Sequence, residues 1–263
     1  MNRGSKARSQ ERLVVETFDE KARAYAEGYR GGSSAAHSFN IRLRRVFELL
    51  DRDRRGRVLD VGCGPGMTVQ ELVKAGFEFY GVDISGEMIG ECEREFGDVL
   101  AAHFSVGRIE KLEFPNGFFD VVLCVGVVEY VDDDRVAVGE MARVVKPGGI
   151  VVVTLPNRAS PYRVWQRTVY SGVRRLMRKV KGRGISAVEV VHREYSEKTL
   201  CDLLASYGLK VTDVVYYNFR VLLFPFDRMF PGLTVLLSRK MERLGRGKLR
   251  RLGTGFVVKA ERM

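Results

Sequence analysis

The stretch VLDVGCGPG, residues 58–66, decides the fold of this 263-residue chain. The run of branched apolar residues around Asp60 predicts a buried strand ending at Val61. Glycines at the end of a strand let the backbone turn sharply and let a ligand approach it closely. The stretch therefore predicts a strand that leads into a ligand-binding turn.

The spacing of these glycines discriminates between ligands. A dinucleotide-binding turn, G-x-G-x-x-G, needs its third glycine at the position of Met67, but the third glycine here is Gly66. The observed pattern, D-x-G-x-G-x-G, begins with Asp60. A phosphate gains nothing from a carboxylate, whereas the ammonium and cationic sulfur of an amino-acid-bearing sulfonium cofactor favour a nearby anion. The turn thus predicts a sulfonium cofactor that carries an amino acid.

A second acid supports this prediction. Residues 77–83, FEFYGVD, predict the next strand, and Asp83 stands at its end, 17 residues after Gly66. An acid at this point of a nucleotide-binding α/β fold accepts hydrogen bonds from ribose hydroxyls.

Strands and helices alternate along most of the chain. Strands are predicted at 57–61, 77–83, 99–106, 118–125, 149–155, 210–217 and 256–262. Helices are predicted at 10–29, 35–50, 67–74, 86–96, 133–145 and 196–207, the last with Ser196 as its N-cap and Gly208 at its end. This alternation predicts an α/β fold with a parallel sheet covered on both faces.

The chain divides into four parts by this pattern. We expect an N-terminal helical cap (1–52), a cofactor-binding core (53–157), a basic insertion or lid (158–195) and a C-terminal part of the core (196–263) with a second basic insertion at 219–251. Residues 158–184 supply +9 and residues 228–251 supply +7 of the formal net charge of +11, so the remainder carries −5. Charge concentrated in this way indicates an anionic partner.

The second basic segment also has an apolar pattern. Helical spacing predicts one stripe of Leu233, Leu237, Met241 and Leu244, with Ser238, Arg239, Glu242 and Arg243 outside it. Such a helix suits an anionic membrane surface, and it also suits a lid that rests its apolar side on its own domain. Both interpretations stay open at this point.

Four stretches together resemble one family. VLDVGCGPG (58–66), GVDIS (81–85), VGRIEKLEFPNGFFDVVLCVGVVEYV (106–131) and EMARVVKPGGIVVVTLPN (140–157) are similar, in order and spacing, to the blocks of class I S-adenosylmethionine-dependent methyltransferases of the type 11, ubiquinone-biosynthesis-like group. The resemblance covers 57–157 strongly and 192–217 more loosely. It implies a Rossmann-like, doubly wound, seven-stranded and mostly parallel sheet with an antiparallel last strand and helical insertions.

The resemblance also implies a set of contacts with S-adenosyl-L-methionine. The glycine turn and Asp60 would meet its methionine part, Asp83 its ribose, and apolar side chains would enclose its adenine. The implied residues are Asp60, Gly62, Cys63, Gly64, Gly66, Asp83, Ile84, Met88, Arg108, Ile109 and Val125. Arg108 stands where the family often has an acid for the adenine amino group, so that bond is absent or made by a carbonyl.

Other residues are candidates on their own pattern. Tyr25 and Tyr29, one helical turn apart, would close over the cofactor or simply pack in an amphipathic helix. His192 precedes the helix at 196, where substrate-facing loops gather, and is a candidate general base together with Tyr130 and Glu129. The quinone O-methyltransferases that this chain resembles have paired acids and a histidine after the fourth strand. This chain has a single acid there, Glu129, and Tyr130 in place of the histidine, so no metal is predicted.

These observations predict methyl transfer to a small, hydrophobic or lipid-linked acceptor, with oxygen favoured over nitrogen or carbon. The alternatives are an RNA methyltransferase that binds phosphates through its basic segments and a non-catalytic cofactor-binding module. The N-terminal residues contain no apolar stretch, and the four cysteines include no CxxC pair. We therefore expect a cytoplasmic protein, with association to a membrane left open.

Overall fold

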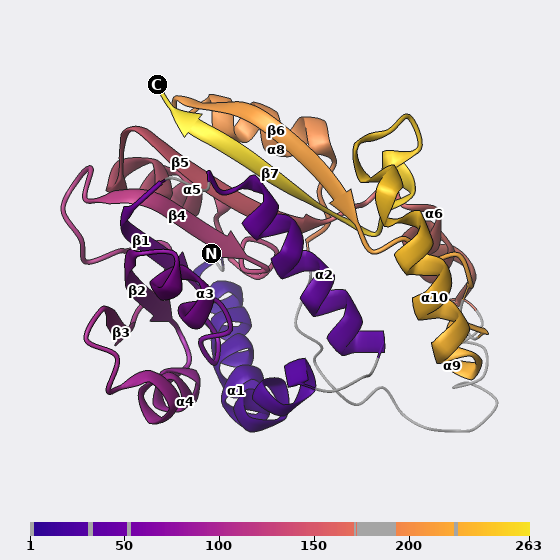
Figure 1. The fold of residues 1–263 in the computed structure, drawn as a ribbon, viewed down its shortest axis with the longest axis horizontal. Coiled ribbons are helices and arrows are strands. Elements are labelled where there is room, and N and C mark those ends of the chain that lie inside the picture. The colour runs from indigo at the N-terminus through magenta and orange to yellow at the C-terminus, as the bar shows by residue number, and fades with distance from the viewer. Residues whose placement is uncertain (1–2, 31–33, 52–53, 171, 173–192, 224–225) are drawn as a thin grey trace.

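The protein is seen in a computed structural model that describes residues 3–30, 34–51, 54–170, 172, 193–223 and 226–263. In this part of the chain one sheet has the strand order β3-β2-β1-β4-β5-β7-β6 (Figure 1). Its strands are β1 (Gly56–Val61), β2 (Phe77–Asp83), β3 (Ala102–Val106), β4 (Phe119–Val125), β5 (Val145–Pro156), β6 (Leu209–Tyr217) and β7 (Gly255–Arg262). β7 is antiparallel to both of its neighbours, and the other pairs are parallel. The predicted fold class is confirmed.

Helices precede, connect and follow these strands. They are α1 (Arg3–Arg30), α2 (Ser34–Leu49), α3 (Val69–Lys74), α4 (Gly86–Phe96), α5 (Asp134–Val144), α6 (Pro161–Trp165), the π-helix η1 (Gln166–Tyr170), α8 (Glu197–Ala205), α9 (Phe226–Met229), α10 (Pro231–Met241) and the short 3-10 turns η2 (Glu242–Arg246) and η3 (Arg250–Leu252). The first two cover the N-terminal part that was predicted as a helical cap.

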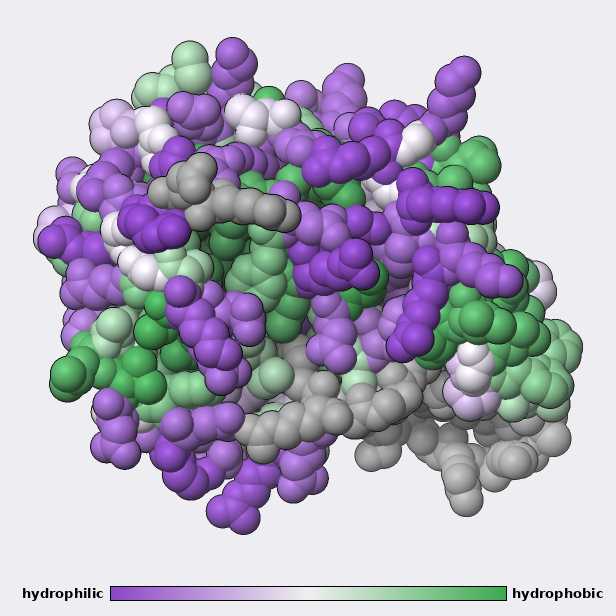
Figure 2. Space-filling model, viewed as in Figure 1, coloured by the Kyte–Doolittle hydropathy of each residue, from purple (hydrophilic) through white to green (hydrophobic). Residues whose placement is uncertain are grey.

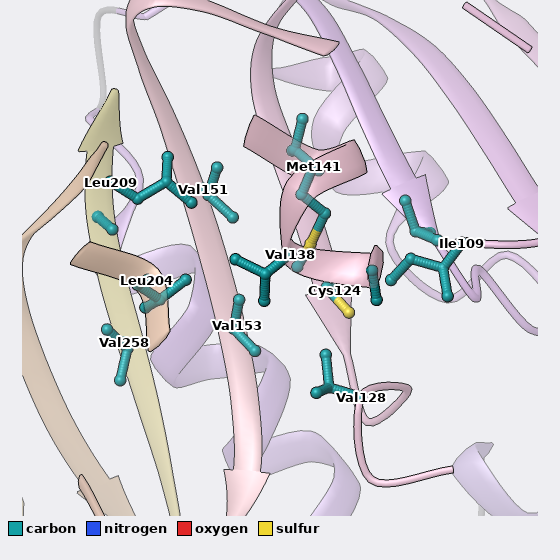
Figure 3. Close-up of a cluster of buried hydrophobic side chains, with 14 of the residues drawn as sticks. Ile109, Cys124, Val128, Val138, Met141, Val151, Val153, Leu204, Leu209 and Val258 are labelled. Atoms are coloured by element: carbon teal, nitrogen blue, oxygen red, sulfur yellow. The ribbon is translucent and has the colours of Figure 1, made fainter. Parts of the chain in front are cut away.

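Both faces of the sheet are buried under apolar side chains. On one face α5 and α8 pack on β4, β5 and β7, and Figure 3 shows Val138, Met141 and Leu204 against Val151, Val153 and Val258. On the other face α2, α3 and α4 contribute Ile41, Val46, Leu72, Ile89 and Cys92. The strand residues between these layers are apolar on both sides, as expected for a covered parallel sheet.

Local signals fixed most boundaries. Ser85 accepts a hydrogen bond from the backbone N–H of Met88 and so caps α4, and Ser196 caps α8 through the N–H of Thr199. Two strands differ from the prediction. β5 begins at Val145 because the Lys146–Gly149 segment bulges within the strand instead of forming a separate turn. β3 begins only at Ala102, whose N–H closes a turn onto the carbonyl of Val99.

The predicted apolar stripe of α10 is neither fully buried nor fully exposed. Ser238 and Glu242, expected outside the stripe, are buried, whereas Leu233 is exposed. Met241 and Leu244 pack only partly against the core. Glu242 points inward because its partners lie there, Arg45 on α2 and the backbone N–H of Asn218 after β6, whereas the buried Ser238 hydroxyl has no partner among the described residues. No helix in the described residues is long and apolar enough to cross a membrane.

Candidate functional site

A pocket opens where the sheet changes direction. The chain runs outward from β1 to β2 and β3, then crosses back to β4, so a crevice forms beside the carboxyl ends of β1 and β4. The residues that follow these ends line the pocket, and α1 and α2 close it from the other side with Val14, Phe18, Tyr25, Phe39, Arg42 and Leu43. α1 is anchored there because the Ser85 hydroxyl hydrogen-bonds Asp19 of that helix.

The glycine turn forms one wall of the pocket. Gly62, Gly64 and Gly66 all have positive φ, which side-chain-bearing residues rarely adopt. At Gly64 (φ +54°) an added Cβ would meet no atom within 4 Å, because this residue faces the pocket. The backbone here is therefore bare and accessible to a ligand.

Asp60 lies beneath the turn in a buried position. Its Oδ2 accepts a hydrogen bond from the Thr68 hydroxyl at 2.6 Å, and its Oδ1 has no partner among the described residues. Burial raises the pKa of this carboxyl to about 7, with a further increase from Asp83 and opposing effects of Thr68 and Arg42. A cation that reaches Oδ1 would offset this cost of burial.

Asp83, at the end of β2, is held rigidly. Its Oδ2 accepts the N–H of Gly64 and its Oδ1 the N–H of Ser85, both at 2.9 Å. Burial raises the pKa of this carboxyl, and the two N–H bonds oppose the increase. Each oxygen retains a lone pair, so the carboxylate can accept two further bonds from a diol.

An apolar slot adjoins Asp83. Met88 and Ile109 are buried and Ile84 half-buried, and all three line the pocket. Arg108 at the rim has acidic partners, with its Nη1 2.8 Å from Glu11 of α1 and its Nε 3.7 Å from Glu110. A flat aromatic ring would fit between these side chains with its edge toward the 108–110 backbone.

The opposite end of the pocket combines an acid with aromatic rings. Glu129 is buried, and its Oε2 has no partner among the described residues. Burial raises the pKa of this carboxyl to about 7, against the opposing effect of Arg42. Phe18 meets Tyr25 and Tyr130 edge to face, with ring centroids 5.8 and 5.4 Å apart. This end suits an apolar guest with one polar group.

The structure brings most predicted site residues together. Asp60, Gly62, Cys63, Gly64, Asp83, Ile84, Met88, Arg108, Ile109, Val125, Glu129, Tyr130 and Tyr25 all line the pocket. Gly66 does not, since a Cβ there would meet the Phe96 ring behind the turn. His192 lies outside the described residues, and Tyr29 lies in α1 with its side chain outside them.

Several lining residues escaped the sequence analysis. Thr68 belongs to no recognised motif, and Arg42 and Phe39 lie in the helix predicted at 35–50, for which no ligand contact was predicted. Phe18 shares one side of the helix predicted at 10–29 with Val14, Ala22 and Tyr25, and this helical spacing of apolar residues predicts burial but not a ligand.

The described residues fit S-adenosylmethionine. The carboxylate of Asp83 can accept from a ribose diol, the slot at Met88 and Ile109 can enclose adenine, and the unpartnered Oδ1 of Asp60 can receive a cation. The bare backbone at Gly64 gives the chain between these groups room to pass.

Comparison with known proteins agrees with this geometry. Residues 59–153 match the family described as Methyltransferase domain. The ubiquinone biosynthesis O-methyltransferase of Methylococcus capsulatus is 35% identical over 133 residues, which span 49% of this chain and 55% of that protein. The 2-methyl-6-phytyl-1,4-hydroquinone methyltransferase of Synechocystis is 38% identical over 117 residues, 43% of this chain and 37% of that protein. The matched segment thus spans about half the length of these relatives or less.

Solved structures share the fold. An S-adenosylmethionine-dependent methyltransferase of Thermotoga maritima superposes with a TM-score of 0.65 at 19% identity, over 95% of this chain and 99% of that one. The [4+2]-cyclase SpnF superposes with a TM-score of 0.62 at 18% identity, over 95% and 94%. Because a cyclase shares the architecture, the fold alone does not decide the reaction.

Proposed function

We propose that this chain, whose residues 59–153 form a class I S-adenosylmethionine-dependent methyltransferase domain, methylates a hydroxyl group on a small apolar acceptor. The observation that carries the proposal is the buried Glu129 carboxylate at the aromatic end of the same pocket that holds Asp60 and Asp83. When bound, the cofactor supplies a methyl group attached to a cationic sulfur. A nucleophile can bond to the methyl carbon and displace the sulfur, which leaves as a neutral thioether.

The first task of the chain is to hold the cofactor in one orientation. Asp83 would bind the ribose hydroxyls and Asp60 the ammonium of the amino acid, while Gly64 lets the backbone approach the connecting atoms. Holding two reactants in line in a site that excludes water lowers the barrier to a displacement. Phe18 and Tyr130, edge to face, help to exclude water from the acceptor end.

The second task is to receive the acceptor's proton. Glu129 has a pKa raised to about 7 by burial, so near neutral pH it can take a proton from a phenolic hydroxyl that hydrogen-bonds its Oε2. Arg42, which lowers the pKa of this carboxyl, stabilises its ionised form before the acceptor arrives. Tyr130 lies beside this position, and His192 stays a sequence-based candidate.

The chemistry of the acceptor follows from the walls. Aromatic and aliphatic side chains surround one buried acid, which suits a phenol or hydroquinone with an apolar substituent. The two relatives named above act, by their names, in ubiquinone biosynthesis and on a phytyl hydroquinone. We propose that the acceptor here belongs to the same chemical class, a phenolic ring with a lipophilic side chain.

Two measurements test the proposal in sequence. Calorimetric titration with S-adenosylhomocysteine is expected to show micromolar binding that Asp83→Ala abolishes, because the variant loses the ribose acceptor. Transfer of a labelled methyl group to a prenylated catechol or hydroquinone, with the product located by mass spectrometry, then identifies the acceptor atom. Cofactor binding without methyl transfer to any phenol would indicate a non-catalytic cofactor-binding module. Methyl transfer to RNA would contradict the proposed phenolic acceptor and indicate an RNA methyltransferase.

A further inference from the structure

The α9–α10 segment buries polar side chains and exposes apolar ones. Within α10, Thr234 and Ser238 are 3% and 2% exposed, whereas Leu233 and Leu236 on the other side are 46% and 51% exposed. Positions 234 and 238 share one face of a helix, and 233, 236 and 240 share the opposite one. The polar side therefore faces the protein and the apolar side faces outward.

Specific bonds lock this orientation. Asp227 of α9 accepts hydrogen bonds from the Tyr162 hydroxyl at 2.6 Å and from Arg220 at 3.2 Å. Glu242, just after α10, accepts from Arg45 of α2 at 3.1 Å and from the backbone N–H of Asn218 at 2.7 Å. Rotating the helix to bury its leucines would break these buried bonds, so the outward apolar face is a fixed feature.

The outward face is a sizeable apolar patch. Besides the two leucines it includes Phe226, Met229 and Phe230, which are 54%, 61% and 50% exposed. Figure 2 shows these elements as a hydrophobic area at the lower right, where Figure 1 places α9 and α10. A contiguous group of large exposed apolar side chains marks an interaction site on a folded protein.

The exposed charges of segment 226–252 have one sign. Asp227 and Glu242 are the two acids of segment 226–252, and both are buried. Arg239, Lys240 and Arg243 of the same segment are exposed. The surface thus offers apolar anchors and cations together, with no exposed acid in this segment.

We propose that the α9–α10 face binds the surface of an anionic lipid bilayer. Apolar side chains enter the boundary between headgroups and acyl chains, and Lys and Arg at their edge pair with anionic headgroups. The other basic segment, residues 158–184, has nine basic residues and no acid, so its charge has the same sign as that of this face and it offers no electrostatic complement to it.

The position of this face connects it to the pocket. α10 packs against α2, and α2 also supplies Phe39, Arg42 and Leu43 to the pocket wall. Docking through α9–α10 would therefore hold the pocket close to a bilayer, where lipophilic phenols dissolve. The docking itself needs no methyl transfer, and its test is independent of the proposed function.

The test is co-flotation of the full chain with vesicles of phosphatidylcholine alone or with phosphatidylglycerol added. We expect binding to the anionic vesicles that weakens when ionic strength rises from about 0.05 to about 0.5 M. Leu233→Asp combined with Leu236→Asp is expected to lower this binding by roughly tenfold or more, because two anchors are lost and two anions gained. Leu100→Asp, at a leucine that is 97% exposed on another surface, is the matched control and keeps wild-type binding.

Retained affinity for S-adenosylhomocysteine in the double variant will show that the pocket is intact. The proposal is overturned if the wild type ignores both kinds of vesicle, or if the double variant and the Leu100→Asp control bind alike. It is also overturned if the double variant changes the sedimentation of the chain in solution without changing vesicle binding, since the face would then join copies of this chain.

Discussion

Thr68 donates its hydroxyl hydrogen to Oδ2 of Asp60 at 2.6 Å, while Oδ1 of the same carboxylate has no partner in the described part of the chain. Half of this buried acid is satisfied by the protein, and half is left for a ligand. A buried polar atom without a partner costs about 1–3 kcal/mol. The unpartnered Oδ1 of Asp60 therefore destabilises the cofactor-free protein and is available to bind the cofactor.

Asp60→Asn should separate these two effects. The folded carboxyl has a pKa of about 7, far above its ordinary value of 3.8, so the unfolded chain releases this proton before the folded one does. The contribution of Asp60 to stability therefore falls as pH rises from about 4 to about 7. The variant, which cannot ionise, should be more stable than the wild type at pH 8 by about 1–3 kcal/mol, and it should bind S-adenosylmethionine at least about tenfold more weakly.

Urea denaturation of both proteins from pH 5 to pH 8 without cofactor measures the first effect, and calorimetry measures the second. Parallel stability curves would show that Asp60 has the same pKa in the folded and unfolded states, contrary to this account.

Gly64 and Gly148 provide a matched pair. Both have positive φ, +54° and +71°, and an added Cβ at either meets no atom within 4 Å. Alanine at each should cost about 1–2 kcal/mol of stability because of the left-handed backbone. Only Gly64 lines the pocket, so only Gly64→Ala should weaken the binding of S-adenosylhomocysteine. Equal affinities for the two variants would show that the cofactor does not approach this backbone.

Local patterns predicted the core of the fold and the cofactor end of the pocket. β2 and α4 have the predicted bounds because both are delimited nearby, by Asp83 and by the cap at Ser85. Asp60, Gly64 and Asp83 converge because the carboxyl ends of neighbouring parallel strands meet at one edge of the sheet. In this region a motif and its structural neighbours lie close together in the sequence.

The acceptor end and α10 depend on long-range partners. Arg42 and Phe39 reach the pocket because α2 packs on β5, β6 and β7, a long-range arrangement that no local pattern specifies. In α10 the apolar stripe and the polar stripe are only one residue out of phase, so periodicity could not decide which one faces inward. Arg45 and Tyr162, distant in sequence, decide it by bonding Glu242 and Asp227.

Glu129→Gln tests the proposed proton acceptor. The pKa of the wild-type carboxyl is about 7, so kcat should rise with pH through this value and then level off, because only the ionised form accepts a proton. The variant should lose this pH dependence and about 10²–10⁴-fold in kcat, with unchanged affinity for S-adenosylhomocysteine. Tyr130→Phe, which keeps the ring that packs on Phe18, should change kcat much less. An unaltered pH profile in Glu129→Gln would assign the proton to another group.

Glu242→Ala should destabilise the protein through the partner it leaves behind. Arg45 is 13% exposed in its side chain and bonds both the carboxylate and the backbone carbonyl of Glu242. The variant leaves Arg45 its ion pair with Glu48 at 2.6 Å, but Arg45 and the buried N–H of Asn218 each lose an acceptor, at a cost of about 1–3 kcal/mol each. In a chain of this size we expect Tm to fall by roughly 10 °C.

Asp213→Ala is the matched control for this effect. It breaks an ion pair of 2.6 Å with Arg246, but those side chains are 32% and 54% exposed, so water solvates the charge that remains. Exposed pairs contribute about 0–1 kcal/mol, so Tm should change by only a few degrees. Thermal unfolding followed by circular dichroism measures both variants. Equal shifts would mean that the bond between α2 and the end of α10 does not hold α10 in place, and the outward orientation of its leucines would lose its main support.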